Sequence, residues 1–308
     1  MALAEGAPPP DDVTGQEPPT DDPVEARRVL RSGFVRSMPW SARIAVLWML
    51  FIVLSAVFAD VLPLQNPNVG ITAGNRPNLS PSAEHLLGTD NNSRDLFARL
   101  IYGARVSLTV SATAVGFGLV FGGFFGAMVG YVRGKTETVV MATIDVILAF
   151  PGLVLLLALI AFLQSASLFA ISLVIGFLSI PPYTRVSRAN TLSIARREFV
   201  TAAEAIGTRR TTILFREIIP NVLPSLVAYA LVASAAIIVL EGSLAFLGLS
   251  VQPPTATWGA MINEGRQNMK QNLLPVIFPS LAMLFTVLSL NTIGDWMRKR
   301  NAYRSAAL

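Results

Sequence analysis

Few residues of this chain have the types and spacing that catalysis or the binding of a phosphate or metal requires. The segment Gly130–Thr136, GYVRGKT, comes nearest to a phosphate-binding loop. Such a loop needs four residues between its two glycines, whereas three separate Gly130 from Gly134, and Val129 stands at the required glycine position. The segment also follows a long apolar run rather than a strand. We therefore interpret it as a short charged turn without a phosphate cradle.

Composition argues against nucleophilic and metal chemistry as well. The chain has no cysteine, which excludes disulfides, thiolate ligands and cysteine nucleophiles. Its one histidine, His85, lies in a turn-rich segment beside Gly88, Thr89 and Asp90, and a single histidine does not make a metal site. We expect no catalytic residue and no metal site, and we interpret His85 as making an ordinary interfacial contact.

Two carboxylates, Asp145 and Glu241, lie within long apolar runs. Ionisable groups inside a membrane span are costly, so each is a candidate for lining or gating a pathway. Alternatively, each forms an internal hydrogen bond or ion pair that holds two helices together. Asp145 also precedes Pro151, which is expected to kink its helix. The sequence leaves both interpretations of the two carboxylates open.

The apolar runs around these residues indicate a membrane protein. The 308-residue chain is 53% hydrophobic and 14% charged, which is too apolar for a soluble domain of this length. Roughly 20 helical residues cross a hydrocarbon core of about 30 Å. Apolar runs that meet this length fall at 43–62, 106–130, 138–163, 168–184, 222–247 and 272–294. We predict an all-α, polytopic membrane protein with six transmembrane helices.

The polar segments between the runs define the remaining organisation. Residues 1–24 are rich in Pro, Asp and Gly and are predicted to form a disordered tail, and residues 25–42 form a basic arm. The first apolar run carries no cleavage signal, so we expect an uncleaved anchor. Residues 63–105 are predicted to be extracytoplasmic, with a helix over 94–105 on the membrane surface. Residues 295–308 form a second cytoplasmic tail.

Lysines and arginines set the expected orientation. With the N-terminus inside, 18 of the 24 fall on the cytoplasmic side. The six on the other side are Arg76, Arg94, Arg99, Arg105, Arg266 and Lys270. Because cytoplasmic loops carry an excess of these residues, both termini and the 185–221 loop are predicted to be cytoplasmic. We expect a multi-pass protein of a prokaryotic cell membrane, in contact with lipid, whose net charge of +5 needs no nucleic-acid partner.

Glycines recur every four residues along the second apolar run. They are Gly118, Gly122, Gly126 and Gly130. Small residues let helices approach closely in a membrane, where packing rather than hydrophobicity drives association. We favour helix–helix packing over a substrate-lining seam, with the neighbouring helix either in this chain or in a partner.

The segment Thr201–Asn221, TAAEAIGTRRTTILFREIIPN, is polar and basic although it lies between two apolar runs. Ala202–Ile206 is predicted to be a helix that Gly207 terminates. Thr208 is predicted to cap a second helix that Pro220 closes. The small residues leave one face almost without side chains, so a partner surface can approach it. The alternative is a basic loop that contacts lipid headgroups.

The spacing of this segment resembles the cytoplasmic loop signature of ABC importer permeases, EAA-x3-G-x9-I-x-L-P. Thr201 stands where an acidic residue is usual, and Glu217 stands where Ile or His is common. The residues that this resemblance assigns to ATPase coupling are Thr201, Ala202, Ala203, Glu204, Gly207, Ile219 and Pro220. ATP and Mg are accordingly expected on partner subunits and not in this chain.

Other segments are similar to the permeases of dipeptide, oligopeptide and nickel importers. They are His85–Leu108, Leu240–Gly259 and the Asn291–Arg298 end of the last run, in the same order as in the family. Ser93 stands where that family usually has glycine, in D-x-x-G-R-D. The resemblance implies a type I ABC importer permease core over residues 106–294, in the C-type subunit of the pair.

The resemblance also implies partners and a mechanism. The partners would be a homologous B-type permease, two cytosolic ABC ATPase subunits and an extracytoplasmic substrate-binding protein. The two permeases would form the translocation path and alternate between inward- and outward-facing states. The family carries peptides, nickel, glutathione and related solutes. Since no set of histidines or carboxylates lies in the spans, we expect short peptides rather than nickel.

Two other classes of function compete with this interpretation. A secondary transporter or channel that needs no ATPase would predict inverted repeats or a charged pathway at the midplane. An intramembrane enzyme would predict converging nucleophiles, paired aspartates or a metal cluster within the spans. The sequence shows none of these patterns, and Asp145 and Glu241 do not lie in a protease signature.

Overall fold

A computed structural model describes residues 38–70, 76–163 and 167–306 of the chain. Two compact units are distinguished: Pro39–Arg298 forms the larger one, and the smaller comprises Met1–Met38 and Lys299–Leu308. The predicted disordered tail and most of the predicted basic arm lie outside the described residues.

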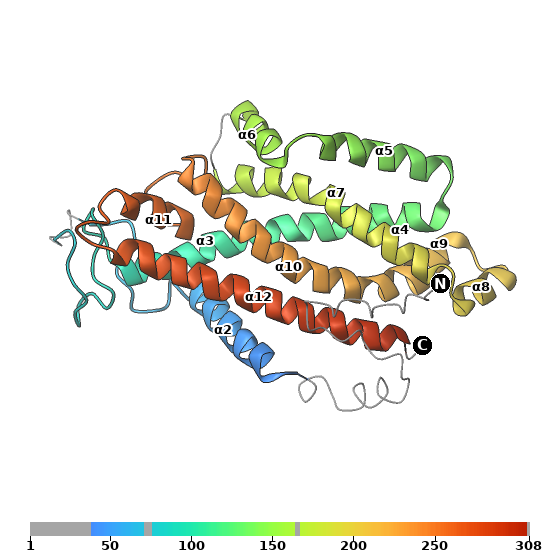
Figure 1. The fold of residues 1–308 in the computed structure, drawn as a ribbon, viewed down its shortest axis with the longest axis horizontal. Helices are drawn as coiled ribbons and strands as arrows, with labels where there is room; N and C mark the ends of the chain where they lie inside the picture. The colour runs from blue at the N-terminus through green and yellow to red at the C-terminus, as the bar shows by residue number, and fades with distance from the viewer. Residues whose placement is uncertain (1–37, 71–75, 164–166, 307–308) are drawn as a thin grey trace, which may run out of the picture. The chain divides into compact units, whose positions relative to one another are not determined.

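The described residues are helical, and their strand-like pairing is limited to a bridge between Thr89 and Asp95. Figure 1 shows α3, α4, α7 and α10 running side by side in the larger unit. The helices are α2 Trp40–Val57, α3 Leu96–Phe117, α4 Gly123–Val132, α5 Lys135–Ala149, α6 Gly152–Leu163, α7 Leu168–Ile194, α8 Glu198–Ala205, α9 Arg210–Ile213, α10 Ile219–Phe246, α11 Trp258–Arg266 and α12 Leu274–Ala306, with π-helical segments η2 Gly118–Gly122 and η3 Leu214–Ile218. The all-α prediction is confirmed.

Helices long and apolar enough to cross a membrane match the predicted spans. Within the described residues they are Trp40–Val57, Leu96–Val132, Leu168–Ile194, Arg210–Phe246 and Leu274–Tyr303. The remaining predicted span, 138–163, corresponds to α5 and α6 together, which are bent by 88° at their junction. Phe150, the residue before Pro151, is extended (φ −79°, ψ 138°), as expected for a residue that precedes proline. The predicted kink is therefore a complete break between two helices.

The segment predicted to lie on the membrane surface, 94–105, is instead the start of α3. Asp95 caps this helix, because its Oδ1 accepts a hydrogen bond from the backbone N–H of Ala98 at 2.7 Å. No break follows before Val132. Arg99, which was expected to face water, is 1% exposed. The prediction of a separate surface helix was therefore wrong.

The helix α7 also continues further than predicted. The apolar run ends near residue 184, but α7 extends to Ile194 and passes through Pro181 and Pro182. Arg185 and Arg188 lie in this added part of α7, and both form ion pairs with carboxylates of α5. The polar loop after this span is accordingly shorter than the predicted 185–221.

The glycine repeat packs against α7 within this chain. A Cβ atom added at Gly122 would lie 2.5 Å from the carbonyl oxygen of Ile180, and one added at Gly126 would lie 2.4 Å from that of Thr184. At Gly118 the nearest α7 atom would be Cδ2 of Tyr183, at 2.4 Å, and at Gly130 it would be Cβ of Thr191, at 2.9 Å. The four glycines, which lie in η2 and α4, therefore allow these two segments to approach α7 closely.

Pro220 does not close a helix, contrary to prediction. It lies in the first turn of α10, directly after η3. The preceding segment, η3, is π-helical, and the backbone N–H of Ile219 bonds to the carbonyl of Leu214. This wider turn lets α9, η3 and α10 form one rod despite the proline.

Candidate functional site

The helix α8 forms a short, separately capped element after α7. It spans Glu198–Ala205, and Gly207 follows with φ +78°. The backbone N–H of Thr208 bonds to the carbonyl of Ala203 and that of Gly207 to Glu204, both at 3.0 Å. This pattern is a Schellman C-cap, which glycine adopts without steric penalty. Thr208 therefore belongs to the C-cap of α8, and the prediction that it caps the next helix was wrong, because the N-cap of α9 is Arg209.

One side of α8 is exposed and nearly free of large side chains. Thr201, Ala202, Glu204 and Gly207 are exposed, and Ala203 is half-buried. A Cβ atom added at Gly207 would meet nothing within 4 Å. Beside this small-residue face, the large apolar side chain of Ile206 is 83% exposed. The small side chains of this face leave room for the surface of another protein to approach closely.

The opposite side of α8 is anchored to the helices of the bundle. Val200 is fully buried in an apolar cluster with residues of α4, α9, η3 and α10, among them Ala127 and Ile218. Tyr131, near the end of α4, donates a hydrogen bond from its hydroxyl to Oε1 of Glu204 at 2.9 Å. A displacement of α8 would therefore act on α4 through this hydrogen bond and on the rest of the bundle through the apolar cluster around Val200. Ile219 and Pro220, the other predicted coupling residues, lie in the first turn of α10 and not on α8.

Asp145 lies on α5 and forms an ion pair with Arg185 of α7. The Arg185 Nη2 to Asp145 Oδ1 distance is 2.6 Å, and both side chains are about half exposed, 58% for Asp145 and 51% for Arg185. A second pair, Arg188 with Glu137, joins the same two helices and is more buried. The two pairs fix α5, whose only buried side chain is that of Ile144.

Glu241 lies elsewhere, in the interior of the bundle. Its side chain is fully buried and accepts hydrogen bonds from the hydroxyl groups of Ser107, at 3.0 Å, and Ser250, at 2.7 Å. These contacts join α10 to α3 and to the loop before α11. The structure therefore does not bring Glu241 and Asp145 together, and it gives Glu241 the geometry of an internal link.

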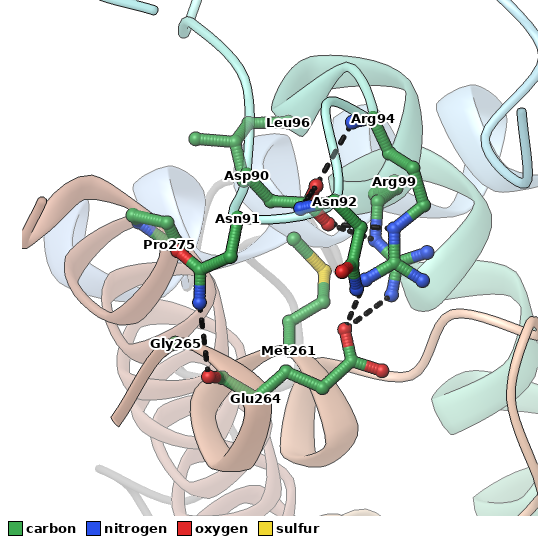
Figure 2. Close-up of a pocket in the computed structure, with 10 residues that line it drawn as sticks. All are labelled: Asp90, Asn91, Asn92, Arg94, Leu96, Arg99, Met261, Glu264, Gly265 and Pro275. Carbon is green, nitrogen blue, oxygen red and sulfur yellow. Dashed lines mark hydrogen bonds and ion pairs between the residues drawn. The ribbon is translucent and has the colours of Figure 1, made fainter. Parts of the chain in front are cut away.

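A buried charge cluster joins the start of α3 to α11, and sequence reasoning missed it. Figure 2 shows Arg94 and Arg99 between Asp90 and Glu264. Arg94 bonds Oδ2 of Asp90 at 2.7 Å and also contacts Glu264, and Arg99 lies 3.2 Å from Glu264 Oε2. The four-residue spacing of Asp90 and Arg94 is compatible with an ion pair between these two residues. Nothing local in the sequence indicates Glu264, which lies 165 positions beyond Arg99.

The same region holds the chain's histidine. His85 is buried, and its Nδ1 lies 3.0 Å from Oδ2 of Asp95, the residue that caps α3. Gln65 approaches the same ring nitrogen at 3.4 Å. Nearby, Ser93 has φ +63°, in the left-handed region that favours glycine. This positive φ explains why the family usually has glycine where this chain has Ser93.

Taken together, the fold and these sites define a class of protein. Long apolar helices that can span a membrane carry a small exposed helix, α8, anchored to them and open to a partner. The opposite end of the larger unit carries α11 and the segment before α3, joined by the charge cluster (Figure 1). This arrangement is that of a multi-pass membrane subunit with a surface open to partner proteins.

Comparison with known proteins identifies the family. Residues 118–304 match the family model described as binding-protein-dependent transport system inner membrane component. The chain is 38% identical to the glutathione transport system permease protein GsiD of Pectobacterium atrosepticum over 223 residues, 72% of this chain and 74% of that protein. It is 35% identical over 257 residues to the proteins of the same name from Escherichia coli O6:K15:H31 and Shigella sonnei, covering 83% of this chain and 84% of each relative.

The chain therefore belongs to the inner membrane components of binding-protein-dependent transport systems. It is a multi-pass inner-membrane permease subunit of an ABC importer with the type I permease fold, and its role is transport rather than catalysis.

Proposed function

We propose that this chain forms one half of the translocation path for short peptides or peptide-like solutes such as glutathione. The relatives named above are glutathione transport permeases, and glutathione is a tripeptide-like molecule with both amine and carboxylate groups. A homologous permease would supply the other half of the path. An extracytoplasmic binding protein would deliver the substrate.

Coupling to ATP hydrolysis would occur at α8. The observation that carries this proposal is the exposed small-residue face that contains Ala202 and Gly207, backed by the buried anchor Val200. Two cytosolic ATPase subunits would supply the ATP and Mg sites. When the ATPases close on each other, α8 would move and take the helices packed on its anchor with it.

This assignment requires α8 to face the cytoplasm. The excess of arginine and lysine around α7, α8 and α9 supports that orientation, as does the charged turn between α4 and α5. Both termini would then be cytoplasmic. The segment before α3 and the region of α11 would face the binding protein.

Copurification with a matched control tests the coupling proposal. The tagged chain is expressed in its native cells, solubilised gently, and compared with the variants Gly207→Arg and Gly248→Arg. Both glycines have positive φ, +78° and +75°, and a Cβ atom at either position meets nothing within 4 Å. The two substitutions therefore impose similar backbone strain. Gly248 follows α10, at the end of the bundle far from α8.

We expect wild type and Gly248→Arg to recover the ATPases and the second permease. We expect Gly207→Arg to keep the second permease and lose the ATPases. Equal recovery of ATPases by all three proteins would remove α8 from the coupling surface. A wild-type chain that purifies alone and transports without ATP would contradict the coupling proposal altogether.

A further inference from the structure

An open groove, here called the α2 groove, lies between α2 and its neighbours α3, α10 and α12. Its volume is about 360 Å³, and its lining residues on α2 run from Met49 to Val57. Two contacts attach α2 to the other helices on either side of the groove. Trp48 donates a hydrogen bond to the hydroxyl of Thr286 on α12 at 3.1 Å. Arg105 of α3 donates from Nη2 to the carbonyl of Val57, also at 3.1 Å.

The surface of the α2 groove suits hydrocarbon better than water. Most of its lining side chains are aliphatic, and the hydroxyl-bearing ones are Thr109, Ser111 and Ser234. Each of these hydroxyl groups donates its proton to a backbone carbonyl, at 2.7, 3.1 and 2.8 Å respectively. Water stays in a cavity only where several polar groups hold it, so the groove favours an apolar occupant.

The depth of the groove in the membrane supports the same conclusion. All four helices that line it belong to segments long and apolar enough to cross a membrane. The hydrocarbon core of a bilayer contains no water, so lipid or protein fills an apolar groove at this depth. A dry cavity of about 150 Å³ already holds a benzene-sized molecule, and the α2 groove therefore has room for part of an acyl chain.

The rim of the groove carries a cation and an anion side by side. Arg105 lines the groove, and its Nη2 forms an ion pair with Oδ2 of Asp60 at 2.8 Å. The two side chains are 35% and 65% exposed. Tyr102 donates from its hydroxyl to Oδ1 of Asp60 at 3.0 Å. The hydrogen bond from Arg105 lowers the pKa of Asp60, so this carboxylate is charged at neutral pH.

This ion pair keeps hydrogen-bonding capacity for a ligand. Among the described residues, Nη1 of Arg105 has no acceptor, because the hydrogen bonds of this guanidinium use Nε and Nη2. Asp60 is more than half exposed, and a carboxylate accepts several hydrogen bonds. A headgroup with a phosphate and a primary ammonium matches the two side chains charge for charge. An anionic headgroup would instead bring its net charge close to Asp60.

The same rim argues against a protein as the occupant. An apolar protein surface that filled the groove and covered its rim would bury both charges, at a large desolvation cost. A lipid headgroup leaves them at the membrane–water interface, where Tyr102 also fits, since tyrosine is enriched at that depth.

We propose that the α2 groove binds a phospholipid with a zwitterionic headgroup that contains a primary amine, such as phosphatidylethanolamine. One acyl chain lies in the groove, the phosphate contacts Arg105, and the ammonium contacts Asp60. The lipid completes the packing of α2 between its two attachment points. This inference goes beyond the proposed function, because it requires neither a transported substrate nor an ATPase.

Photo-crosslinking tests whether lipid occupies the groove. The complete importer is reconstituted in nanodiscs with phosphatidylethanolamine that carries a diazirine in one acyl chain, and crosslinked residues are mapped by mass spectrometry after irradiation. Bulk lipid labels any exposed apolar position. Yields at Val53 and Leu108, which line the groove, are therefore compared with the yield at Leu284, an exposed residue of α12 outside it. We expect several-fold higher yields in the groove. Equal or lower yields, as a protein seated there would produce, overturn the inference.

Filling the groove provides a matched pair of variants. Ala112 is an exposed lining residue of α3, so Ala112→Phe places a ring in the groove without entering the core. Ala142→Phe changes an exposed alanine of α5 that does not line the groove. We expect Ala112→Phe to lose the excess crosslinking at Val53 and Ala142→Phe to keep it. Excess crosslinking that survives in Ala112→Phe contradicts the proposed position of the acyl chain.

Competition in the wild-type protein tests the headgroup and does not depend on the folding of a groove variant. The unlabelled lipid of the nanodisc is either phosphatidylethanolamine or phosphatidylglycerol. Phosphatidylethanolamine should lower the crosslink at Val53 about two- to fivefold more than phosphatidylglycerol, the range that a partly exposed ion pair supports. Asp60→Asn should remove this preference. Equal competition by the two lipids in wild type, or a preference that survives Asp60→Asn, overturns the assignment of the headgroup.

A second groove serves as an internal control for the headgroup. It is lined by residues of α10, α11 and α12, including Phe246 and Met283, and no carboxylate is among its lining residues. The guanidinium of Arg266 lies 4.3 Å from the centre of the Phe246 ring. A cation without an anion does not select a zwitterion, so crosslinks at Met283 should show no preference for phosphatidylethanolamine. The same preference in both grooves would mean that the Arg105–Asp60 pair does not cause it.

Discussion

The hydroxyl of Tyr131 lies 2.9 Å from Oε1 of Glu204 and joins the end of α4 to α8. Glu204 belongs to the exposed helix that we propose as the ATPase contact, and Tyr131 belongs to the rod that packs against α7 along the four glycines. The hydrogen bond is thus a direct link from the coupling helix to a helix of the span. Its partners are 73 positions apart in the chain.

Tyr131→Phe tests this link. The substitution removes the hydroxyl and keeps the ring, so α8 should stay folded and lose about 1 kcal/mol of its attachment to α4. We expect the ATPases to copurify at wild-type levels, while the amount of substrate carried per ATP hydrolysed falls. Glu204→Gln, which keeps an acceptor oxygen, should retain most of the coupling. Unchanged coupling in Tyr131→Phe would show that Val200 and the apolar cluster transmit the movement without the hydrogen bond.

Gly126→Ala tests the packing of the glycine repeat. The new Cβ atom would lie 2.4 Å from the carbonyl oxygen of Thr184 and 2.5 Å from Cβ of Ser187, so α4 and α7 must separate. Overpacking of this kind costs about 1–3 kcal/mol, and the thermal midpoint of the purified protein should fall. Gly116→Ala, in the same rod with nothing within 4 Å, is the matched control and should not lower it. Equal midpoints for both variants would refute the close packing.

Ser93→Gly is expected to stabilise the protein. Ser93 has φ +63°, a region that costs an L-residue roughly 1–2 kcal/mol. Its hydroxyl is also buried without a hydrogen-bond partner among the described residues. Glycine relieves both penalties but gains freedom in the unfolded chain, so the expected net gain is about 1 kcal/mol. Ser80→Gly, at an exposed position without positive φ, should give no gain in a thermal denaturation measurement.

Glu264→Ala tests the buried charge cluster of Figure 2. The substitution leaves Arg99, which is 1% exposed, without its carboxylate partner on α11. Removing one partner of a buried pair costs about 3–5 kcal/mol, and the 28% exposure of Glu264 places the expected loss at the low end of that range. Glu84→Ala, at an exposed carboxylate of the same region, should change stability by less than about 0.5 kcal/mol. A small effect of Glu264→Ala would mean that water replaces the carboxylate.

The spans and the coupling helix were predictable from the sequence because their signals are local. A run of about 20 apolar residues identifies a span wherever it occurs, and Gly207 identifies the end of α8 through its backbone freedom alone. The break at Pro151 was predictable for the same reason, although its 88° angle was not. The course of the chain near Pro220 was missed because a single π-helical turn, η3, accommodates the proline.

The contacts between distant segments were not predictable. Arg99 was interpreted as a surface residue, since its partner Glu264 lies in a different loop and no rule of spacing connects them. The partner of Asp145, Arg185, was equally hidden by the 40 positions between them. A single sequence predicts that a buried charge needs a partner, but the partner residue is identified only in the folded structure.

The π-helical segment η2 has a consequence for how the glycine repeat keeps its alignment. Four residues of an α-helix turn through about 40° more than one revolution, so glycines spaced by four would drift around the rod and leave the line of contact. The wider turn of η2, which holds one more residue per hydrogen-bonded loop, counters this drift between Gly118 and Gly122. A one-residue deletion within η2 would rotate all of α3 relative to α4. The buried arginines at the α3 end of the rod would then no longer face their partners while Tyr131, at the α4 end, still faces α8.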